Sequence, residues 1–122
     1  YMEQPLVTLM EKAGLDINYI TDLDVDSRPD VFTQTHSIVL GGHSEYWTKS
    51  MRQHFDNAVA SGVNLIVFGG NTGYAVTEIK GREISGRTPY REIKQPESLL
   101  LGSQYFSLGI RKDLVSRAST RW

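Results

Sequence analysis

The spacing of apolar residues predicts a helix near the N-terminus, followed by a strand and an acidic loop. Residue 14 is a glycine, which suits the position just after a helix. Residues 15–20 alternate between apolar and polar side chains, the pattern of a half-buried strand. Residues 22–30 are rich in aspartate and predict a solvated loop. The predicted helix rests on four apolar residues at helical spacing: Leu6, Leu9, Met10 and Ala13.

Two short apolar runs, each followed by a pair of glycines, predict buried strands. Residues 37–40 precede Gly41 and Gly42, and residues 63–68 precede the second pair. A helix that begins near Ser44 or Thr48 and ends at a glycine is expected between them. Strands that alternate with helices indicate a parallel sheet covered on both sides. The apolar face of the intervening helix would consist of Trp47, Met51, Phe55, Ala58 and Val59.

The pattern changes after residue 74. Residues 77–80 and 82–84 flank Gly81, which predicts a hairpin or a loose antiparallel excursion. Proline and glutamate at positions 96 and 97 predict the start of another helix, and residues 99–101 and 105–106 should return to the core. We therefore expect one α/β domain over residues 1–122. Because the chain begins at a tyrosine and ends without a recognisable stop, we expect it to be a fragment of a larger multidomain chain.

Composition excludes several classes of partner and chemistry. The 122 residues are 39% hydrophobic, enough for one core. A formal net charge of -1 argues against binding to nucleic acid or to an anionic membrane surface. No apolar run is long enough to cross a bilayer, and no signal-peptide pattern is present, which favours the cytoplasm but leaves the compartment open. The absence of cysteine excludes disulfides, thiolate nucleophiles and cysteine-based zinc sites.

Polar side chains follow both double glycines, and they are the candidates for chemistry. His43 and Glu45 follow the first pair, and Asn71 follows the second. Ligands bind parallel sheets at the carboxyl ends of the strands, so neighbouring strands would bring these side chains into one crevice. An imidazole and a carboxylate two residues apart suit metal binding or general acid/base work. Equally, Ser44 and Glu45 could simply cap a helix and His43 could be a structural turn residue, while Tyr46 and Trp47 are expected to pack in the core.

The sequence gives little support for other binding or catalytic motifs. The aspartates at positions 22, 24 and 26 alternate like the start of a calcium loop, but that loop needs a glycine where Ser27 stands and a glutamate where Thr33 stands. There is no serine-hydrolase elbow and no glycine-rich phosphate loop. His36 and His54 lack any metal-binding spacing, so surface or helix-face roles are expected for them.

Four segments together resemble the large (beta) subunit of N,N-dimethylformamidase and its relatives. The most specific is the Gly-His-x-Glu-Tyr-Trp run within residues 39–47, and the Gly-Gly-Asn-Thr run within residues 64–72 follows in the right order. Residues 19–24 and 95–102 also look like that family. The resemblance implies a three-layer α/β fold with a parallel sheet and flanking helices, similar to class I glutamine amidotransferases and flavodoxin.

The same resemblance implies an iron-dependent amidohydrolase that cleaves small N-substituted formamides to formate and an amine. Glu45 would be a ligand of a mononuclear Fe3+, His43 would orient water or substrate beside it, and Asn71 would line the pocket. The family's two tyrosine ligands should lie upstream of Tyr1, and its glutamate base should lie beyond Trp122. The isolated chain is therefore expected to be inactive. A small subunit and a homo-oligomer are possible partners in the parent protein.

An alternative is a non-catalytic amidotransferase-like module that binds a ligand or supports neighbouring domains, because fold does not fix function. The enzyme hypothesis predicts that His43, Glu45 and Asn71 converge around one point. The binding or scaffolding hypothesis predicts a cavity without metal and a His43 that makes structural hydrogen bonds.

Overall fold

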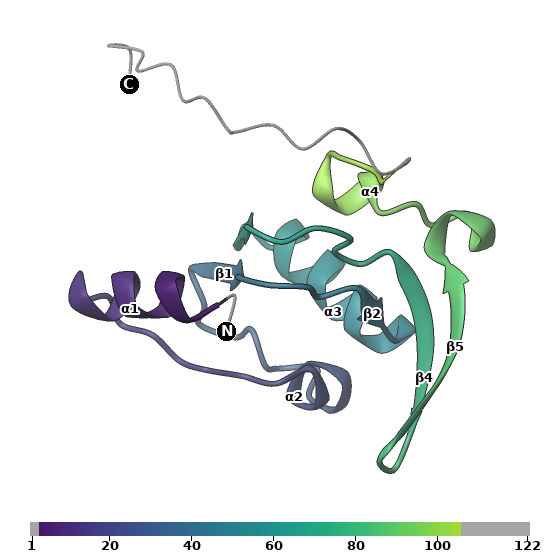
Figure 1. Cartoon of the computed structure of the whole chain (residues 1–122), viewed down its shortest axis with the longest axis horizontal. Coiled ribbons are helices and arrows are strands. Elements are labelled where there is room, and N and C mark those ends of the chain that lie inside the picture. Colours follow the sequence, from purple (N-terminus) through teal and green to yellow (C-terminus); the bar gives the residue numbers. More distant parts are fainter. Residues whose placement is uncertain (1–2, 106–122) are drawn as a thin grey trace.

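Residues 3–105 are described by a computed structural model, and their strands form two small sheets (Figure 1). In the first sheet, β1 (Ser37–Leu40) runs parallel to β3 (Asn64–Val67). In the second, β2 (Tyr46–Trp47) runs parallel to β4 (Ala75–Lys80), which pairs antiparallel with β5 (Glu83–Pro89). The chain therefore passes twice from the first sheet to the second, once after β1 and once after β3.

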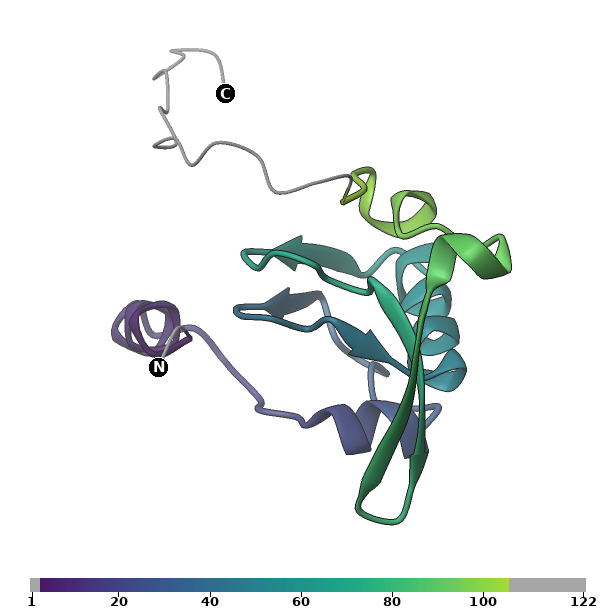
Figure 2. The ribbon, with the colours of Figure 1, turned by 45° about the vertical axis from the view of Figure 1, so that its right-hand side comes forward.

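The longest helix, α3 (Lys49–Ala60), joins β2 to β3 and packs on one side of the strands (Figure 2). Helix α1 (Gln4–Lys12) lies away from α3, near the loop that follows β1. The other helical segments are α2 (Asp22–Ser27), the 3-10 helix η1 (Tyr90–Ile93) and α4 (Ser98–Leu101). Within residues 3–105, no helix is both long and apolar enough to span a bilayer.

Aromatic side chains dominate the core between α3 and the second sheet. The Trp47 ring stacks on Phe55 with 4.4 Å between centroids, and Phe32 contacts the other side of this cluster, 5.2 Å from Phe55. The buried Tyr90 hydroxyl donates to the carbonyls of Trp47 and Thr48, at 3.1 and 2.6 Å. Burial raises the pKa of the Tyr90 phenol well above its usual range, so the hydroxyl keeps its proton and remains a donor.

Several predicted elements are confirmed. Helix α1 ends where expected, with Gly14 in the left-handed region at φ 70°. The two apolar runs form β1 and β3, and these strands are parallel. The hairpin around Gly81 is also present, and its strands are longer than the sequence pattern indicated. Helix α4 begins directly after the proline and glutamate at positions 96 and 97.

The predictions for residues 15–20 and 22–30 were wrong. Residues 15–20 form no strand, because alternation alone does not supply a neighbouring strand to pair with, and Tyr19 and Ile20 are exposed. The acidic stretch contains α2 rather than a continuous loop. Its start is a capping box, in which the Thr21 hydroxyl accepts from the Asp24 backbone N–H and the Asp24 carboxylate accepts from the Thr21 backbone N–H.

Of the two predicted N-caps of the central helix, Thr48 is confirmed and Ser44 is not. The predicted helix face needs a correction, because Trp47 belongs to β2. The expected packing role of the two aromatic residues is nevertheless seen, because Trp47 is fully buried and Tyr46 is half-buried beneath the Arg87 guanidinium. His54 has the expected helix-face role, with Nδ1 2.6 Å from the Val25 carbonyl.

Burial along the strands is less complete than predicted. In β3, Leu65 and Val67 are half-buried while Ile66 is exposed, so only one face is covered by the described residues. Of the leucines in α4, Leu100 packs on the core, but Leu99 is 73% exposed. Phe106 lies outside the described residues. The three-layer, amidotransferase-like architecture stays a prediction.

The N-cap of α3 gives a first testable prediction. The Thr48 hydroxyl accepts from the Met51 backbone N–H at 3.1 Å and donates to the Asp26 carboxylate, which ties α2 to α3. We expect Thr48→Ala to lower the free energy of unfolding by about 2 kcal/mol, the upper end for a lost cap. Denaturant titration would measure this loss. The neighbouring Ser50→Ala, at an exposed first-turn position, should change stability little; equal losses in both variants would contradict the assignment.

Candidate functional site

The two loops that follow β1 and β3 are joined by backbone hydrogen bonds. The Gly73 N–H donates to the Ser44 carbonyl at 2.8 Å, and the Ala75 N–H donates to the Glu45 carbonyl at 3.1 Å. These bonds extend the pairing of the parallel strands past their carboxyl ends. Figure 2 shows both loops projecting side by side from the same edge. The structure thus brings the segments that carry His43, Glu45 and Asn71 together at the edge where ligands bind parallel sheets.

Glycine at two positions makes this close approach possible. A Cβ atom on Gly69 would lie 1.8 Å from the Gly42 carbonyl oxygen, far inside contact distance. A Cβ atom on Gly42 would lie 1.9 Å from the Glu3 carboxylate. A side chain at position 69 would therefore force the two loops apart, whereas a side chain at position 42 would displace the Glu3 side chain.

The Trp47 side chain connects the loop after β1 to the core. Its indole N–H donates to the Ser44 hydroxyl at 2.7 Å, so this serine anchors the loop to the core instead of capping a helix. His43, one residue earlier, is exposed, and Glu45, one residue later, is half-buried. In the first loop, His43 is therefore open to solvent and Glu45 is partly covered.

Glu3 is a neighbour of this loop that sequence reasoning missed. Its side chain lies against Gly41 and Gly42, at the start of α1. A hydrogen bond from its own backbone lowers the pKa of the Glu3 carboxyl, and the nearby His43 lowers it further. No local signal points to this contact, because it depends on how α1 packs against a loop almost 40 positions later in the chain.

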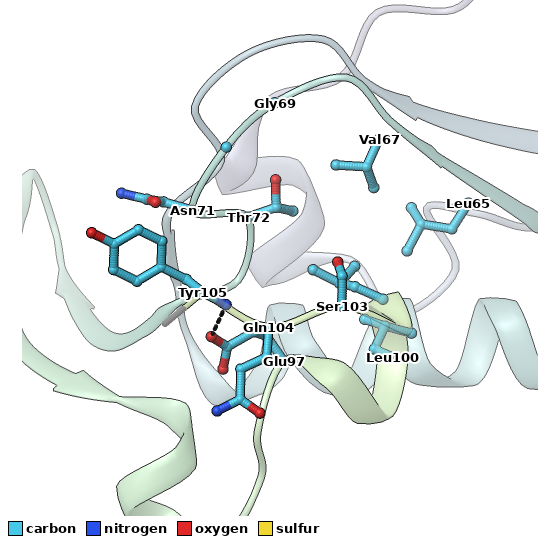
Figure 3. A pocket seen from close by; sticks show the side chains of 12 residues that line it. Leu65, Val67, Gly69, Asn71, Thr72, Glu97, Leu100, Ser103, Gln104 and Tyr105 are labelled. Atoms are coloured by element: carbon cyan, nitrogen blue, oxygen red, sulfur yellow. Dashed lines mark hydrogen bonds between the residues drawn. The ribbon is translucent and has the colours of Figure 1, made fainter. Parts of the chain in front are cut away.

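The second loop borders a cavity of about 470 Å³ (Figure 3). Asn71 lines this cavity, whereas His43 and Glu45 are not among its lining residues. Asn71 adopts the left-handed conformation, with φ 57°, which asparagine tolerates better than most residues. The cavity is lined by Leu65, Val67, Gly69, Gly70, Asn71, Thr72, Glu97, Leu100, Leu101, Ser103, Gln104 and Tyr105.

Two buried polar side chains in this cavity have an atom without a hydrogen-bond partner among the described residues. Thr72 is 5% exposed and its Oγ1 is unpaired. Glu97 is 3% exposed; its Oε1 accepts from the Tyr105 N–H at 3.3 Å, while its Oε2 is unpaired. Sequence reasoning interpreted Glu97 only as part of a helix start. The sequence shows an acidic residue beside the proline, but it does not indicate that this side chain is buried.

The first loop offers a carboxylate and an imidazole as metal ligands, and a metal ion would need further ligands from elsewhere. A carboxylate oxygen and an imidazole nitrogen are donors that iron accepts. Between residues 3 and 105, however, no three histidine, aspartate or glutamate side chains gather closely enough to hold a metal ion. The role of Glu45 as an iron ligand stays a prediction, since the described residues bring no further donors together with it.

Comparison with known protein families identifies the family of this chain. No curated protein matches the sequence. The family described as N,N-dimethylformamidase beta subunit-like, C-terminal, matches over residues 1–122. The match spans the entire sequence, including both glycine loops and the helix that carries the cavity's leucines. The chain therefore belongs to the family described as N,N-dimethylformamidase beta subunit-like, C-terminal.

Proposed function

We propose that this chain supplies part of the active site of an iron-dependent amidohydrolase that acts on small N-substituted formamides. The observation that carries the proposal is the pairing of the two loops: hydrogen bonds at Ser44 and Glu45 place the His-x-Glu segment alongside residues 71–75. Membership of the dimethylformamidase-like family supports the reaction class. The parallel pairing of β1 and β3 supports a three-layer, amidotransferase-like architecture for the larger domain.

In this proposal each residue has a separate task. Glu45 is one of the iron ligands, its carboxylate held in the half-buried loop. When bound, the iron supplies Lewis acidity for the formyl group and for water. His43 accepts a hydrogen bond from the attacking water and orients it. The Asn71 amide N–H donates to the substrate's carbonyl oxygen, where negative charge grows as water adds.

The overall reaction balances with water as the only co-reactant. The water oxygen forms a bond to the formyl carbon, the C–N bond breaks, and the nitrogen leaves as an amine after it takes a proton. The products are formate and the amine. The family is named for a beta subunit, so we also propose that the parent protein assembles with a second type of subunit.

Substitution of Glu45 tests the metal role. In the natural protein that contains this sequence, we expect Glu45→Gln to reduce bound iron at least tenfold, because the amide loses the negative charge that holds the ion. Elemental analysis of the purified protein gives the iron content, and release of formate from N,N-dimethylformamide gives the activity. Both should fall together.

Glu78→Gln is the matched control, because Glu78 is an exposed glutamate of β4 that forms a surface ion pair with Lys80. Its iron content and activity should equal those of the unaltered protein. If Glu45→Gln retained its full complement of iron, Glu45 would not be a ligand. If the unaltered protein held iron but released no formate from any N-substituted formamide, the proposed reaction would be wrong.

A further inference from the structure

The first turn of α1 lies against the double glycine that precedes His43. Glu3 and Leu6 are three positions apart and therefore share one face of the helix. A Cβ atom on Gly41 would lie 3.1 Å from Leu6 Cδ2, and one on Gly42 would lie 1.9 Å from Glu3 Oε1. The leucine thus packs on the first glycine, and the carboxylate lies against the second, directly before His43.

The Glu3 carboxylate is directed to this loop and not to its own helix, because its side chain makes no capping hydrogen bond to α1. A hydrogen bond from its own backbone lowers the pKa of the Glu3 carboxyl, and attraction to His43 lowers it further. The carboxyl is therefore ionised at neutral pH. Both side chains are exposed, so their attraction acts through water and weakens as salt is added.

We propose that Glu3 is a positioning residue for His43: its carboxylate lies against the turn at Gly42 and stabilises positive charge on the neighbouring imidazole. This inference rests on the proposed hydrolysis, in which His43 accepts a hydrogen bond from the attacking water. As the water adds to the formyl carbon, this hydrogen bond strengthens and the imidazole takes up part of the positive charge. The Glu3 carboxylate stabilises that charge more in the transition state than before it, and so raises kcat.

Substitution of Glu3 in the natural protein tests this role through the separate responses of kcat and KM. In a buffer of low ionic strength, Glu3→Gln should lower kcat for formate release from N,N-dimethylformamide about fivefold, the effect of one unit charge on another across a few ångströms of water. KM should change less than about twofold, because the role assigned to Glu3 is not to bind substrate. Iron content should equal that of the unaltered protein. An unchanged kcat with a raised KM would contradict the proposal.

Ionic strength separates an electrostatic role from a structural one. At about 1 M NaCl the Debye length is about 3 Å, so the kcat values of the unaltered protein and Glu3→Gln should agree within about twofold. A difference that stayed fivefold at high salt would come from lost packing and would overturn the proposal. Glu11→Gln is the matched control, because Glu11 is an exposed glutamate of the same helix that accepts from the Tyr19 hydroxyl at 2.8 Å. Its kcat should equal that of the unaltered protein at both salt concentrations.

A methyl group at position 42 tests the same carboxylate from the loop side. The backbone of Gly42 lies outside the left-handed region, so alanine can adopt it, but the added Cβ atom would displace Glu3 Oε1. At low salt, Gly42→Ala should lower kcat about threefold, and in a Glu3→Gln background it should have little further effect, since no charge is left to displace. Equal losses in both backgrounds would mean that the loop itself is distorted, which would contradict the role of Glu3.

Failure of this inference can be told from failure of the proposed hydrolysis. If the unaltered protein releases formate and Glu3→Gln does so equally fast at low salt, the hydrolase stands and Glu3 has no such role. If the unaltered protein holds iron but releases no formate from any N-substituted formamide, the hydrolase fails, and the inference that rests on it fails with it.

Discussion

Replacing Gly69 with alanine should cost 3 kcal/mol or more of the free energy of unfolding, roughly the upper limit for overpacking a well-packed site. The added methyl group would lie 1.8 Å from the Gly42 carbonyl oxygen, and both sides of the clash are backbone, so no side chain can rotate away. The two loops would have to separate. Denaturant titration would measure the loss of stability, and iron content in the natural protein would report whether the loops still form the site.

Gly70→Ala is the matched control for this prediction. It adds the same methyl group one residue later, where nothing lies within 4 Å of the new Cβ atom. Stability should be unchanged or slightly higher, because alanine restricts the unfolded chain more than glycine does. If the two variants lost stability equally, the contact between the double-glycine loops would not be the cause.

The second large effect is expected at Trp47. Truncation to alanine should lower the free energy of unfolding by about 4 kcal/mol, because the side chain is completely buried and stacked on Phe55. It also removes the donor that holds the Ser44 hydroxyl, so the first loop should loosen. Faster amide hydrogen exchange at residues 43–45, measured under conditions where Trp47→Ala is still folded, would reveal this second consequence.

Phe68→Ala is a suitable comparison, since Phe68 is another large aromatic residue at the end of a strand but is 64% exposed. Its truncation should cost less than 1 kcal/mol, because little surface is removed from water in the described fold. A similar loss for Trp47→Ala and Phe68→Ala would show that the tryptophan is not the anchor of the core.

Elements with a complete local signal were predictable, and those that depend on a distant partner were not. The hairpin around Gly81 and the parallel strands before the double glycines were visible in the sequence. The strand predicted at residues 15–20 failed because an alternating pattern forms a strand only where another edge is available. Trp47 has helical spacing to Met51 but lies in β2, before the helix. The residue that caps the start of α3 is Thr48.

Helix α2 was missed for a different reason, since its capping box was present in the sequence. The alternating aspartates are typical of a solvated loop, but Thr21 and Asp24 also have the three-residue spacing of a capping box. For the candidate site, the sequence pattern pointed to the two loops, and the structure pairs them. The burial of Glu97 and the contact of Glu3 with Gly42 depend on packing between segments far apart in the chain, which spacing cannot reveal.

The hydrogen bonds between the two loops also limit how this region can vary in length. Gly73 and Ala75 are paired with Ser44 and Glu45, so one inserted or deleted residue between Asn71 and Ala75 would shift Asn71 along its partner. The hairpin tip at Gly81 has no such constraint and can accept extra residues. Among homologous chains, length differences should therefore collect at the hairpin, while the distance in sequence from Asn71 to Ala75 stays constant.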